Sequence, residues 1–596
     1  MFKDISFFTW KDLKINGIED EYVKFVLNDR LKDREMWKKL VQPFYTREDT
    51  DDGFWRGEFF GKEMRGASLV YRYTGDRELY EILTEAVKDI LAAEDDKGRI
   101  ATYNADNEFF GWDMWCRKYV LTGLMHYVDI CEDEEFKKEI ISALIGHADY
   151  IVSKIGNGEG KKSITETSSW WGCVNSCTIL EPMLALYKAT GKNDYLKFAE
   201  YIISTGGSSD CNFLELALEN KLMPYQYPVV KAYETMSYFE GLLAYYEITG
   251  EQKYLQAVIN FIDAVNKSDM TIIGCAGCTH ELFDNSTVKQ TEYSEQIMQE
   301  TCVTVTWMRI SARLFMISGE RKYLDRIEKS GFNALYGSLN LEHNEQYNML
   351  MKKYVKPMTF DSYSPLYLNR RGRGTGGYLE FKNGGACGCC VAIGACGIAL
   401  MALSAAFKYD NGVIIDYLFD GEIKTNCDCG KPVTLRLASD YPSECKGKIT
   451  VECDGECKPG LFVRVPDWGG KIVVCGREYD GEYADLSGVY KNGDEIVIEY
   501  FPELKAHRLN GKVAFTYGVL TLARDEEKCD EDISEAIEVD ENPVYKLISP
   551  QKHEAIRIKL RLKDGGEILL TDYQSCGKNW CGKKNRITVW CNEKSE

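Results

Sequence analysis

The sequence predicts a multidomain protein in which an all-α (α/α)6 toroid, or barrel, is followed by two all-β sandwich domains. Three observations lead to this fold class. The chain has 596 residues, which is too long for a single hydrophobic core. A helix–turn–helix phrase recurs through the first two thirds of the chain. After about residue 410 the pattern changes to short stretches in which apolar and polar residues alternate.

The recurring phrase marks the ends of helix pairs. It reads YRYTGDRELYEIL around Gly75, LYKATGKNDYLKFAEYI around Gly191, YYEITGEQKYLQAVINFI around Gly250 and FMISGERKYLDRIEKSGF around Gly319. A degenerate copy, YVDICEDEEFKKEIISAL, surrounds Cys131. In each copy an amphipathic helix ends, the chain turns and a second helix begins, and glycine suits a left-handed cap at such a turn. The copies are 56 to 69 residues apart, which leaves room for two helices and their loops.

Helix pairs in series bury their apolar faces only by stacking on one another. The segments between the pairs are rich in aromatic and polar residues: WRGEFFGKEMRG, FFGWDMWCRKY, ETSSWWGCVNSC and PVVKAYETMSYFEGL. A closed ring would gather these segments at one mouth, whereas an open solenoid would leave them scattered along a surface. We therefore expect a closed ring whose final helix is ACGIALMALSAAFKYD, and the open solenoid is the alternative.

The last third of the chain predicts β-structure. GKITVECDGE, GLFVRVPDW, KIVVCGREYDG and DEIVIEYF alternate with period two and break at Gly, Asn and Asp. A second run starts at GKVAFTYGVLTLARDE and continues through HEAIRIKLRL, EILLTDY and RITVWCN. We expect the barrel over residues 1–408, a first β-sandwich over 409–508 and a second over 509–596, with the β domains serving as packing modules.

Composition narrows the classes of partner. The formal net charge is −20, which disfavours nucleic acid and anionic membranes because both require a basic face. No window is apolar enough for a transmembrane helix, and the first residues, MFKDISFFTWKDLKING, lack the apolar core of a signal peptide. We expect a cytoplasmic protein that binds neither nucleic acid nor membrane, and a homodimer stays open.

Cysteines cluster in GGACGCCVAIGAC, where Cys389 and Cys390 are adjacent. In a reducing compartment such clusters are more often metal-binding or catalytic than disulfide-bonded. A second stretch, QETCVTVTWMRISARLFMISG, places Glu300 two residues before Cys302. In extended chain these two side chains share a face, and we expect the following helix to begin near Val303.

These four side chains could bind one zinc ion. Three thiolates and a carboxylate suit Zn²⁺, and so anionic a site would hold a reactive thiolate better than it would activate water. The residues alone leave other interpretations open. Cys275 and Cys278 could form a structural four-cysteine zinc site with Cys387 and Cys389, or the cysteines could simply be small buried hydrophobic residues.

The motifs together resemble glycoside hydrolase family 127, the β-L-arabinofuranosidase family. The resemblance is carried by THELFD with Glu281, by QETC with Glu300 and Cys302, and by CGCC with Cys389 and Cys390. PGLFVRVPDW, KNGDEIVIEYFP and GKVAFTYGVLTLARD resemble the family's β region, so the resemblance covers most of the chain.

The resemblance implies a catalytic (α/α)6 barrel, β-sandwiches and a retaining mechanism with a zinc-bound cysteine nucleophile. By motif, Cys389 would attack the anomeric carbon and Glu281 would act as acid and then base. Glu300, Cys302 and Cys390 would complete the zinc shell with Cys389.

The sequence departs from the family pattern near the predicted sugar pocket. Val391, Ala392 and Ile393 follow the cysteine pair where the family typically has Pro-x-Asn. Thr178 and Glu240 stand where two pocket histidines are expected, and the chain has only six histidines. Aromatic faces stack on sugars and polar groups fix hydroxyls, although Trp and Tyr are also common in cores. On this basis the candidate substrate-binding residues are Trp112, Asp113, Trp170, Trp171, Asn175, Tyr233, Glu234, Glu240, His280 and Tyr363.

The sequence thus predicts a retaining exo-glycoside hydrolase that resembles β-L-arabinofuranosidases and acts on an oligosaccharide or glycoside, with the sugar left open. The alternative is a non-catalytic, zinc-stabilised carbohydrate-binding or scaffold protein. Another toroid activity, such as a lyase or epimerase, is less favoured because those sites usually need a Tyr or His base.

Overall fold

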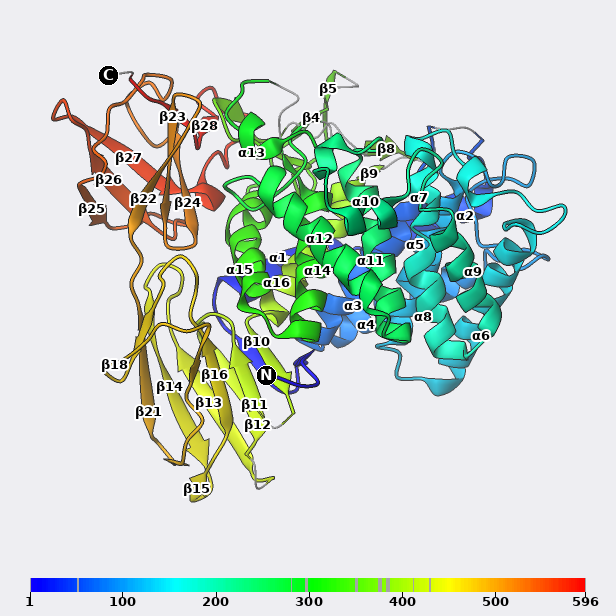
Figure 1. Ribbon diagram of the computed structural model, residues 1–596, viewed down its shortest axis with the longest axis horizontal. Coiled ribbons are helices and arrows are strands. Elements are labelled where there is room, and N and C mark those ends of the chain that lie inside the picture. The colour runs from blue at the N-terminus through cyan, green and yellow to red at the C-terminus, as the bar shows by residue number, and fades with distance from the viewer. Residues whose placement is uncertain are drawn as a thin grey trace.

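The structure, a computed structural model, separates a helical body from two β-rich units (Figure 1). The helical body occupies one side of the molecule, and the two β units lie against its other side, one above the other. The residues that the structure describes are 2–50, 53–279, 281–294, 299–348, 352–372, 378–381, 386–410, 412–427 and 430–594.

Inner helices form a closed ring. Within the described residues, each of six inner helices packs on the next, and the last one, α16, packs on the first, α3, which closes the ring. Helix α16 is buried along its whole length, as the core helix of a toroid must be. The prediction of a toroid is therefore confirmed and the open solenoid is wrong. The inner helices are α3 (Gly57–Thr74), α5 (Asp113–Val128), α8 (Leu180–Thr190), α11 (Ala232–Thr249), α14 (Thr301–Ser318) and α16 (Cys389–Leu403).

Amphipathic helices surround this ring and bury one face against it. A run of α1 (Ile18–Val26), a π turn (Leu27–Leu31) and α2 (Arg34–Thr46) fills one outer position. The other outer helices are α4 (Arg77–Leu91), α6 (Glu134–Lys154), α9 (Asn193–Ser204), α12 (Gln252–Ser268) and α15 (Arg321–Ser330). Short helices α7 (Val174–Cys177), α10 (Phe213–Glu219) and α13 (Ser286–Lys289) lie in the connections.

The four repeated glycines cap inner helices, as predicted. Gly75, Gly191, Gly250 and Gly319 follow α3, α8, α11 and α14 with φ of 64°, 68°, 71° and 70°. Residues other than glycine rarely adopt this left-handed conformation. At the degenerate copy near Cys131, α5 ends instead on a right-handed residue. Because these caps are the carboxyl ends of the inner helices, the amino ends meet at the opposite mouth of the barrel, together with the long connections.

The first β unit is a sandwich of two sheets. The segment 406–409, predicted as the end of the last helix, is strand β10, because its backbone pairs antiparallel with β1 on one side and β11 on the other. One sheet has the order β1 (Ser6–Phe7), β10 (Ala406–Tyr409), β11 (Gly412–Ile415), β16 (Gly460–Arg464) and β19 (Tyr483–Asp485). The other has the order β18 (Arg477–Tyr479), β17 (Ile472–Val474), β21 (Glu495–Tyr500), β14 (Lys446–Cys453), β13 (Pro432–Ala438), β12 (Gly421–Asn426) and β2 (Leu13–Ile15), and β15 (Glu456–Cys457) pairs with β20 (Tyr490–Lys491).

The second β unit is built on a sheet that also recruits a strand of the barrel. Strand β7 (Asn369–Arg370) pairs with β28 (Arg586–Thr588), which ties this unit to the barrel mouth. The remaining strands are β22 (Leu504–Leu509), β23 (Lys512–Tyr517), β24 (Leu520–Asp525), β27 (Glu567–Asp572), β26 (Arg557–Arg561), β25 (Tyr545–Ile548) and β29 (Cys591–Asn592). The domain limits proposed at 408/409 and 508/509 fall inside β10 and β22, and they remain predictions.

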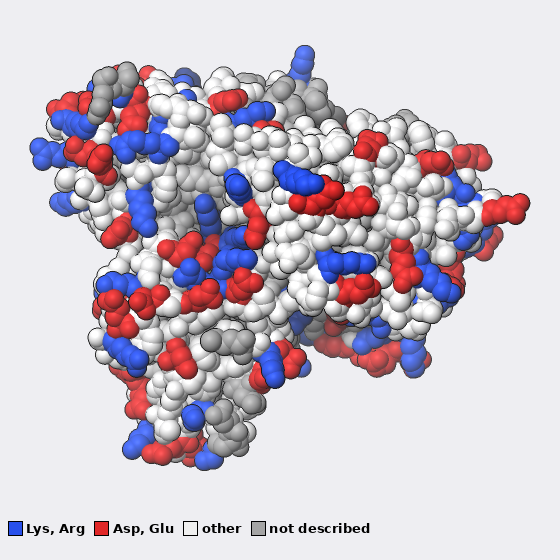
Figure 2. Space-filling model, viewed as in Figure 1, with Lys and Arg blue, Asp and Glu red and all other residues white. Residues whose placement is uncertain are grey.

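Charged residues are spread over the surface. On the face shown in Figure 2, lysine and arginine side chains are interspersed with aspartate and glutamate. Among the helices that the structure describes, none combines the length and the apolar character that crossing a membrane requires.

A buried ionic cluster joins the first β unit to the barrel. Arg464 on β16 contacts Asp416 of the same unit, and Asp325 and Glu328 of the barrel helix α15, with 2.8 Å from Arg464 Nη2 to Glu328 Oε2. Arg464 is 1% exposed. Burial raises the pKa of Asp416 to about 7 and that of Asp325 to about 6, and the charge of Arg464 acts in the opposite direction.

We predict that Arg464→Met destabilises the fold in a pH-dependent way. At pH 8 the free energy of unfolding should fall by about 3–5 kcal/mol, because several buried carboxylates lose their cation. Since the folded pKa values lie above the unfolded ones, these carboxyls take up protons on folding, and that contribution to stability is lost as pH rises through about 6 to 7. The loss should therefore be smaller at pH 5. Denaturation of variant and wild type at both pH values measures it.

Lys448→Met is the control, because Lys448 makes an exposed ion pair with Glu495 and should cost less than about 1 kcal/mol at either pH. An Arg464→Met loss that is equal at pH 5 and pH 8 would show that the cluster contributes through packing alone.

Candidate active site

The four predicted metal ligands meet at the amino ends of two inner helices. Glu300 ends strand β3 (Gln299–Glu300) in extended conformation, and Cys302 lies in the first turn of α14. Cys389 and Cys390 open α16. All four side chains are buried, and their ligand atoms lie within 4.8 Å of one another. Helix α14 begins at Thr301, two residues earlier than Val303, so the extended chain ends at Glu300, two residues before Cys302.

The spacing of these atoms fits a metal ion. The Sγ atoms of Cys302 and Cys390 are 3.5 Å apart, those of Cys389 and Cys390 are 3.8 Å apart, and Glu300 Oε1 is 3.8 Å from Cys390 Sγ. Sulfurs that bind one tetrahedral ion at about 2.3 Å lie about 3.8 Å apart. Glu300 Oε2 is buried and has no hydrogen-bond partner among the described residues. A set of three sulfurs and one oxygen suits a borderline-soft cation and not Mg²⁺ or Ca²⁺.

The alternative four-cysteine site is wrong. Cys387 Sγ accepts a hydrogen bond from Arg30 at 3.0 Å, and Cys278 Sγ accepts one from Gln299 at 2.9 Å. Cys275 Sγ donates to the Glu300 carbonyl at 3.2 Å. Within the described part of the chain, Glu300, Cys302, Cys389 and Cys390 are the one group with metal-ligand geometry.

A buried lysine that sequence reasoning missed supplies positive charge beside this cluster. Lys62 on α3 is fully buried, and its Nζ lies 3.9 Å from Cys302 Sγ and 3.1 Å from Glu58 Oε1. Hydrogen bonds from the thiols of Cys302 and Cys390, together with nearby lysine charges, lower the pKa of Cys389 well below its ordinary value. Lys62 thus places a positive charge where a thiolate in this cluster would need one. The available signal was the Glu58–Lys62 spacing of one helical turn inside WRGEFFGKEMRG.

Glu281 lies in a strained turn that is held against the start of α11. It adopts a left-handed conformation with φ of 68°, which is rare outside glycine and often marks functional sites. Its carboxylate accepts a 2.9 Å hydrogen bond from Tyr363 and forms an ion pair with Lys231. Tyr363 is on β6 (Tyr363–Ser364) and pairs in register with Glu300 on β3. One strand pair therefore connects Glu281 to the metal-ligand cluster.

Lys231 is a second site residue that sequence reasoning missed. Its Nζ is also 3.6 Å from Glu234 Oε2, an atom that is buried and has no hydrogen-bond partner among the described residues. Burial opposes the charge on Lys231, but Glu234, Glu281 and Glu300 outweigh it and raise the pKa of Lys231 well above its ordinary value. Lys231 thus stays charged between two carboxylates.

The remaining predicted residues lie in different surroundings. Trp112 and Trp170 lie on two adjoining loops, next to Asn175 of α7, with the half-buried Trp171 beside them in a left-handed conformation. Tyr233 lies deeper, and its hydroxyl contacts that of Tyr119.

Asp113 and Glu240 are engaged by arginines instead. Asp113 Oδ2 accepts from Arg117 Nε at 2.9 Å, and Glu240 forms an ion pair of 3.1 Å with Arg309. His280 lies outside the described residues.

Comparisons with known proteins identify the family of this chain. A family model described as "Beta-L-arabinofuranosidase, GH127 catalytic domain" matches residues 10–402. The chain belongs to glycoside hydrolase family 127. This GH127 member is thus an enzyme that hydrolyses O-glycosyl bonds, and the non-catalytic alternative is set aside. A search of curated proteins finds no match to the chain.

Solved structures share the fold along the whole chain. A GH127 β-arabinofuranosidase superposes with a TM-score of 0.76 at 16% identity, over 99% of this chain and 98% of that one. A GH127 β-L-arabinofuranosidase from Geobacillus stearothermophilus T6 gives 0.72 at 16% identity, over 98% and 100%. A protein titled glycoside hydrolase gives 0.69 at 15% identity, over 100% and 98%.

We predict that this GH127 enzyme purifies with about one metal ion per chain. Cys302→Ser and Cys390→Ser should each lower the metal content at least about tenfold, because each removes a thiolate ligand. Cys396→Ser is the matched control, since Cys396 is buried on the same helix but lies outside the cluster. Elemental analysis of the four proteins makes the measurement. Equal metal content in all four proteins would contradict the assignment of this cluster as the metal site.

Proposed function

We propose that the chain is a retaining exo-glycoside hydrolase in which Cys389 is the nucleophile and Glu281 is the general acid and base. The observation that carries this proposal is the placement of the Cys389 sulfur in a buried cluster beside Lys62, with Glu281 connected to the same cluster through Tyr363. A thiolate nucleophile and a carboxyl group that acts as acid and base are the two groups that a double-displacement reaction needs.

We assign Zn²⁺ to the cluster, held by Glu300, Cys302, Cys389 and Cys390. Sulfur-rich tetrahedral sites favour zinc over harder cations, and the sulfur spacing supports this choice. Bound there, zinc would keep the thiolates deprotonated and fixed in direction. Lys62 adds positive charge from the side of α3.

The chain's own residues account for both steps. In the first step, Glu281 gives its proton to the leaving oxygen while the Cys389 sulfur forms a bond to the anomeric carbon and the glycosidic bond breaks. In the second step, Glu281 takes a proton from water, the water oxygen bonds to the anomeric carbon and the carbon–sulfur bond breaks. Two inversions give net retention.

Lys231 and Glu234 suit a group that alternates between acid and base. Lys231 forms an ion pair with Glu281. The second step requires Glu281 as a carboxylate, which is the form that such an ion pair accommodates. When Glu281 carries a proton, the Lys231 charge has another partner in Glu234, whose Oε2 is 3.6 Å from Nζ. Tyr363 keeps the Glu281 carboxyl in place in both states.

The substrate class follows from the family and from the pocket. The name of the matching family points to a β-L-arabinofuranoside, and we adopt that as the first substrate to test. The family resemblance leads us to expect histidines at positions 178 and 240. The residues that stand there, Thr178 and Glu240, instead make contacts within the protein. Thr178 donates to the Asn175 carbonyl at 2.6 Å, and Glu240 pairs with Arg309. The sugar specificity is therefore a separate question from the reaction.

We predict that Cys389→Ser lowers kcat/KM on 4-nitrophenyl β-L-arabinofuranoside by about 10³-fold or more, because the hydroxyl is a far weaker nucleophile than the thiolate. The circular dichroism spectrum should be unchanged, and proton NMR of the wild-type reaction should show the β-anomer as the first product. Cys396→Ser serves again as the control. Full activity in Cys389→Ser would contradict the assignment of the nucleophile.

We predict that Glu281→Gln separates substrates by their leaving group. A sugar or alkyl leaving group needs protonation, so its kcat/KM should fall by about 10²–10⁴-fold. Dinitrophenyl glycosides leave without a proton and should lose much less in the first step. Steady-state rates on both substrate types make the comparison. An equal loss on both would argue against a role as acid.

A further inference from the structure

Two aromatic loops at the barrel mouth are bonded to each other. Trp112 precedes α5, and Trp170 precedes α7. Asn175 Nδ2 donates to the Gly111 carbonyl and to Ser168 Oγ, both at 3.2 Å, and the Trp170 amide donates to the same Ser168 hydroxyl at 3.1 Å. These bonds fix the two tryptophans relative to each other, with ring centroids 6.3 Å apart.

From these loops a row of aromatic rings leads into the barrel. Trp112 is 5.9 Å from Trp115, and Trp115 is 5.5 Å from Tyr233, measured between ring centroids. The exposed fraction falls from 41% at Trp170 to 9% at Trp112 and 1% at Trp115. The row therefore runs from the surface to the interior.

The inner end of this row touches the catalytic cluster. Trp115 Nε1 donates to Glu58, Glu58 is bonded to Lys62, and Lys62 Nζ is 3.9 Å from Cys302 Sγ. An exo-acting enzyme binds its terminal sugar at the nucleophile, in the closed end of the pocket. Whatever is bound further towards the surface is the leaving group. The Trp112–Trp170 pair is on that outer side.

Two buried polar groups beside Trp112 lack partners. Among the described residues, the indole Nε1 of Trp112 and the Oδ1 of Asn175 have no hydrogen-bond partner, although both side chains are at least nine-tenths buried. A buried polar group without a hydrogen-bond partner destabilises the fold unless a ligand pairs with it. One is a donor and the other is an acceptor, which is the combination that sugar hydroxyl groups satisfy.

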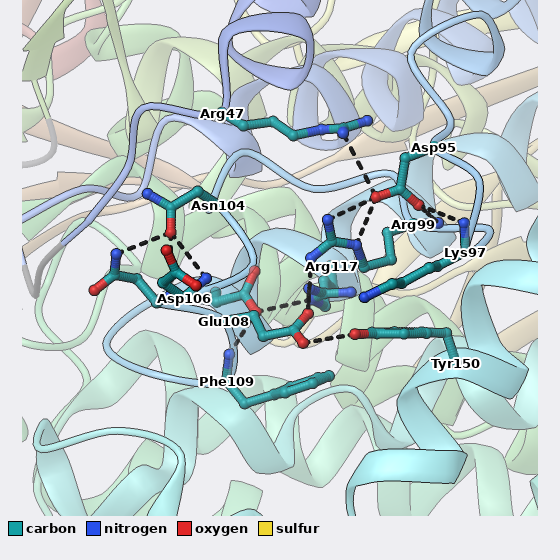
Figure 3. Close-up of polar contacts among 12 residues, drawn as sticks. Arg47, Asp95, Lys97, Arg99, Asn104, Asp106, Glu108, Phe109, Arg117 and Tyr150 are labelled. Atoms are coloured by element: carbon teal, nitrogen blue, oxygen red, sulfur yellow. Dashed lines mark hydrogen bonds and ion pairs between the residues drawn. The ribbon is translucent and has the colours of Figure 1, made fainter.

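The loop that carries Trp112 is held by a partly buried charge network (Figure 3). Glu108 accepts from Arg99 Nη1 at 3.0 Å, from Arg117 Nη2 at 3.2 Å and from the Tyr150 hydroxyl at 2.5 Å. Three elements therefore hold one carboxylate of the loop. Such support keeps a binding surface in place before the ligand arrives.

Two further bonds fix the backbone directly before Trp112. The Phe109 amide donates to Asp113 Oδ2 at 2.8 Å, and the Phe109 carbonyl accepts from Lys162 Nζ at 2.8 Å. Phe109 itself has a left-handed φ of 56°. Asp113, which the sequence predicted as a sugar-binding residue, therefore helps to position the neighbouring Trp112.

We propose that Trp112 and Trp170 form a subsite for a sugar ring in the leaving group, so that the substrate is an oligosaccharide, or a glycoside whose leaving group is itself a sugar. This inference rests on the proposed function. Indole faces stack on sugar C–H surfaces, while Trp112 Nε1 and Asn175 Oδ1 bind hydroxyls. A flat apolar leaving group would stack but would leave both polar groups unpaired, which disfavours it.

This subsite can be tested by measuring how the glycosyl-enzyme intermediate divides between transfer to an added acceptor and hydrolysis by water. With 4-nitrophenyl β-L-arabinofuranoside as donor, the wild type should transfer the glycosyl group to methyl β-L-arabinofuranoside and to methanol as well as to water. In Trp112→Ala and Trp170→Ala, the ratio of sugar transfer to hydrolysis should fall about tenfold, whereas the methanol ratio should change less than about twofold. Trp112→Phe keeps the ring but not the donor, so it should give an intermediate ratio.

Trp10→Ala is the control for Trp170→Ala. Trp10 is 45% exposed, close to the 41% of Trp170, but it packs beside Gly75 at the opposite end of the barrel. Three results would each overturn the subsite. The first is an unchanged ratio of sugar transfer to hydrolysis in the Trp112 and Trp170 variants, and the second is an equal fall in their ratio of methanol transfer to hydrolysis. The third is a wild type that transfers the glycosyl group to methanol but not to the sugar.

A binding measurement separates this proposal from the proposed function. In the Cys389→Ser background, an L-arabinofuranosyl disaccharide should bind at least about tenfold more tightly than methyl β-L-arabinofuranoside in calorimetric titration, and Trp170→Ala should abolish the difference. Absence of turnover with every donor would count against the function, while equal affinities for disaccharide and monosaccharide would count against the subsite.

Discussion

The candidate active site depends on one constraint, which is that four groups able to bind a metal ion lie within 4.8 Å of one another in buried space. Three thiols and a carboxyl group meet where β3, α14 and α16 begin. Ionised and uncompensated, they would be too costly to bury. The fold supplies compensation from all sides: the amino ends of two helices, Lys62 on α3 and room for a cation. In the proposed mechanism, the same compensation would keep the sulfur of Cys389 in the reactive thiolate form.

The toroid explains why these groups can meet at all. Cys302 and Cys390 are 88 positions apart in the chain, and Lys62 is 240 positions from Cys302. Each comes from the amino end of an inner helix, and glycine caps terminate inner helices at the other end. Because all inner helices run in one direction, the long connections and the charged side chains gather at one mouth. The β units then secure that barrel from outside through contacts such as the Arg464 cluster.

Local patterns in the sequence are sufficient to predict the elements but not the long-range contacts. The glycine caps and the alternating strands follow from periodicities of 3.6 and 2, and the motif resemblance singles out the four residues that the fold brings together as a possible metal site. Lys62 and Lys231 were missed in the sequence, because their importance comes from ion pairs and buried neighbours that only the folded chain brings together. For the same reason Asp113 and Glu240 look like free pocket carboxylates in the sequence, whereas arginines engage both of them in the structure. Strands β1 and β2 are too short to stand out before their sheets are known.

The replacement of the expected pocket histidines is best understood as a coupled change. Glu240 is paired with Arg309, and Arg309 also lies 3.2 Å from Glu181, so the space that an imidazole would line is filled by internal ion pairs. A histidine at position 240 alone would leave Arg309 with one carboxylate and would bury an imidazole beside a cation, which disfavours its protonation. Sugar recognition in this chain must therefore come from other groups. Glu234 and Trp112 retain buried polar atoms without hydrogen-bond partners among the described residues, and such atoms are the ones that a bound sugar can satisfy.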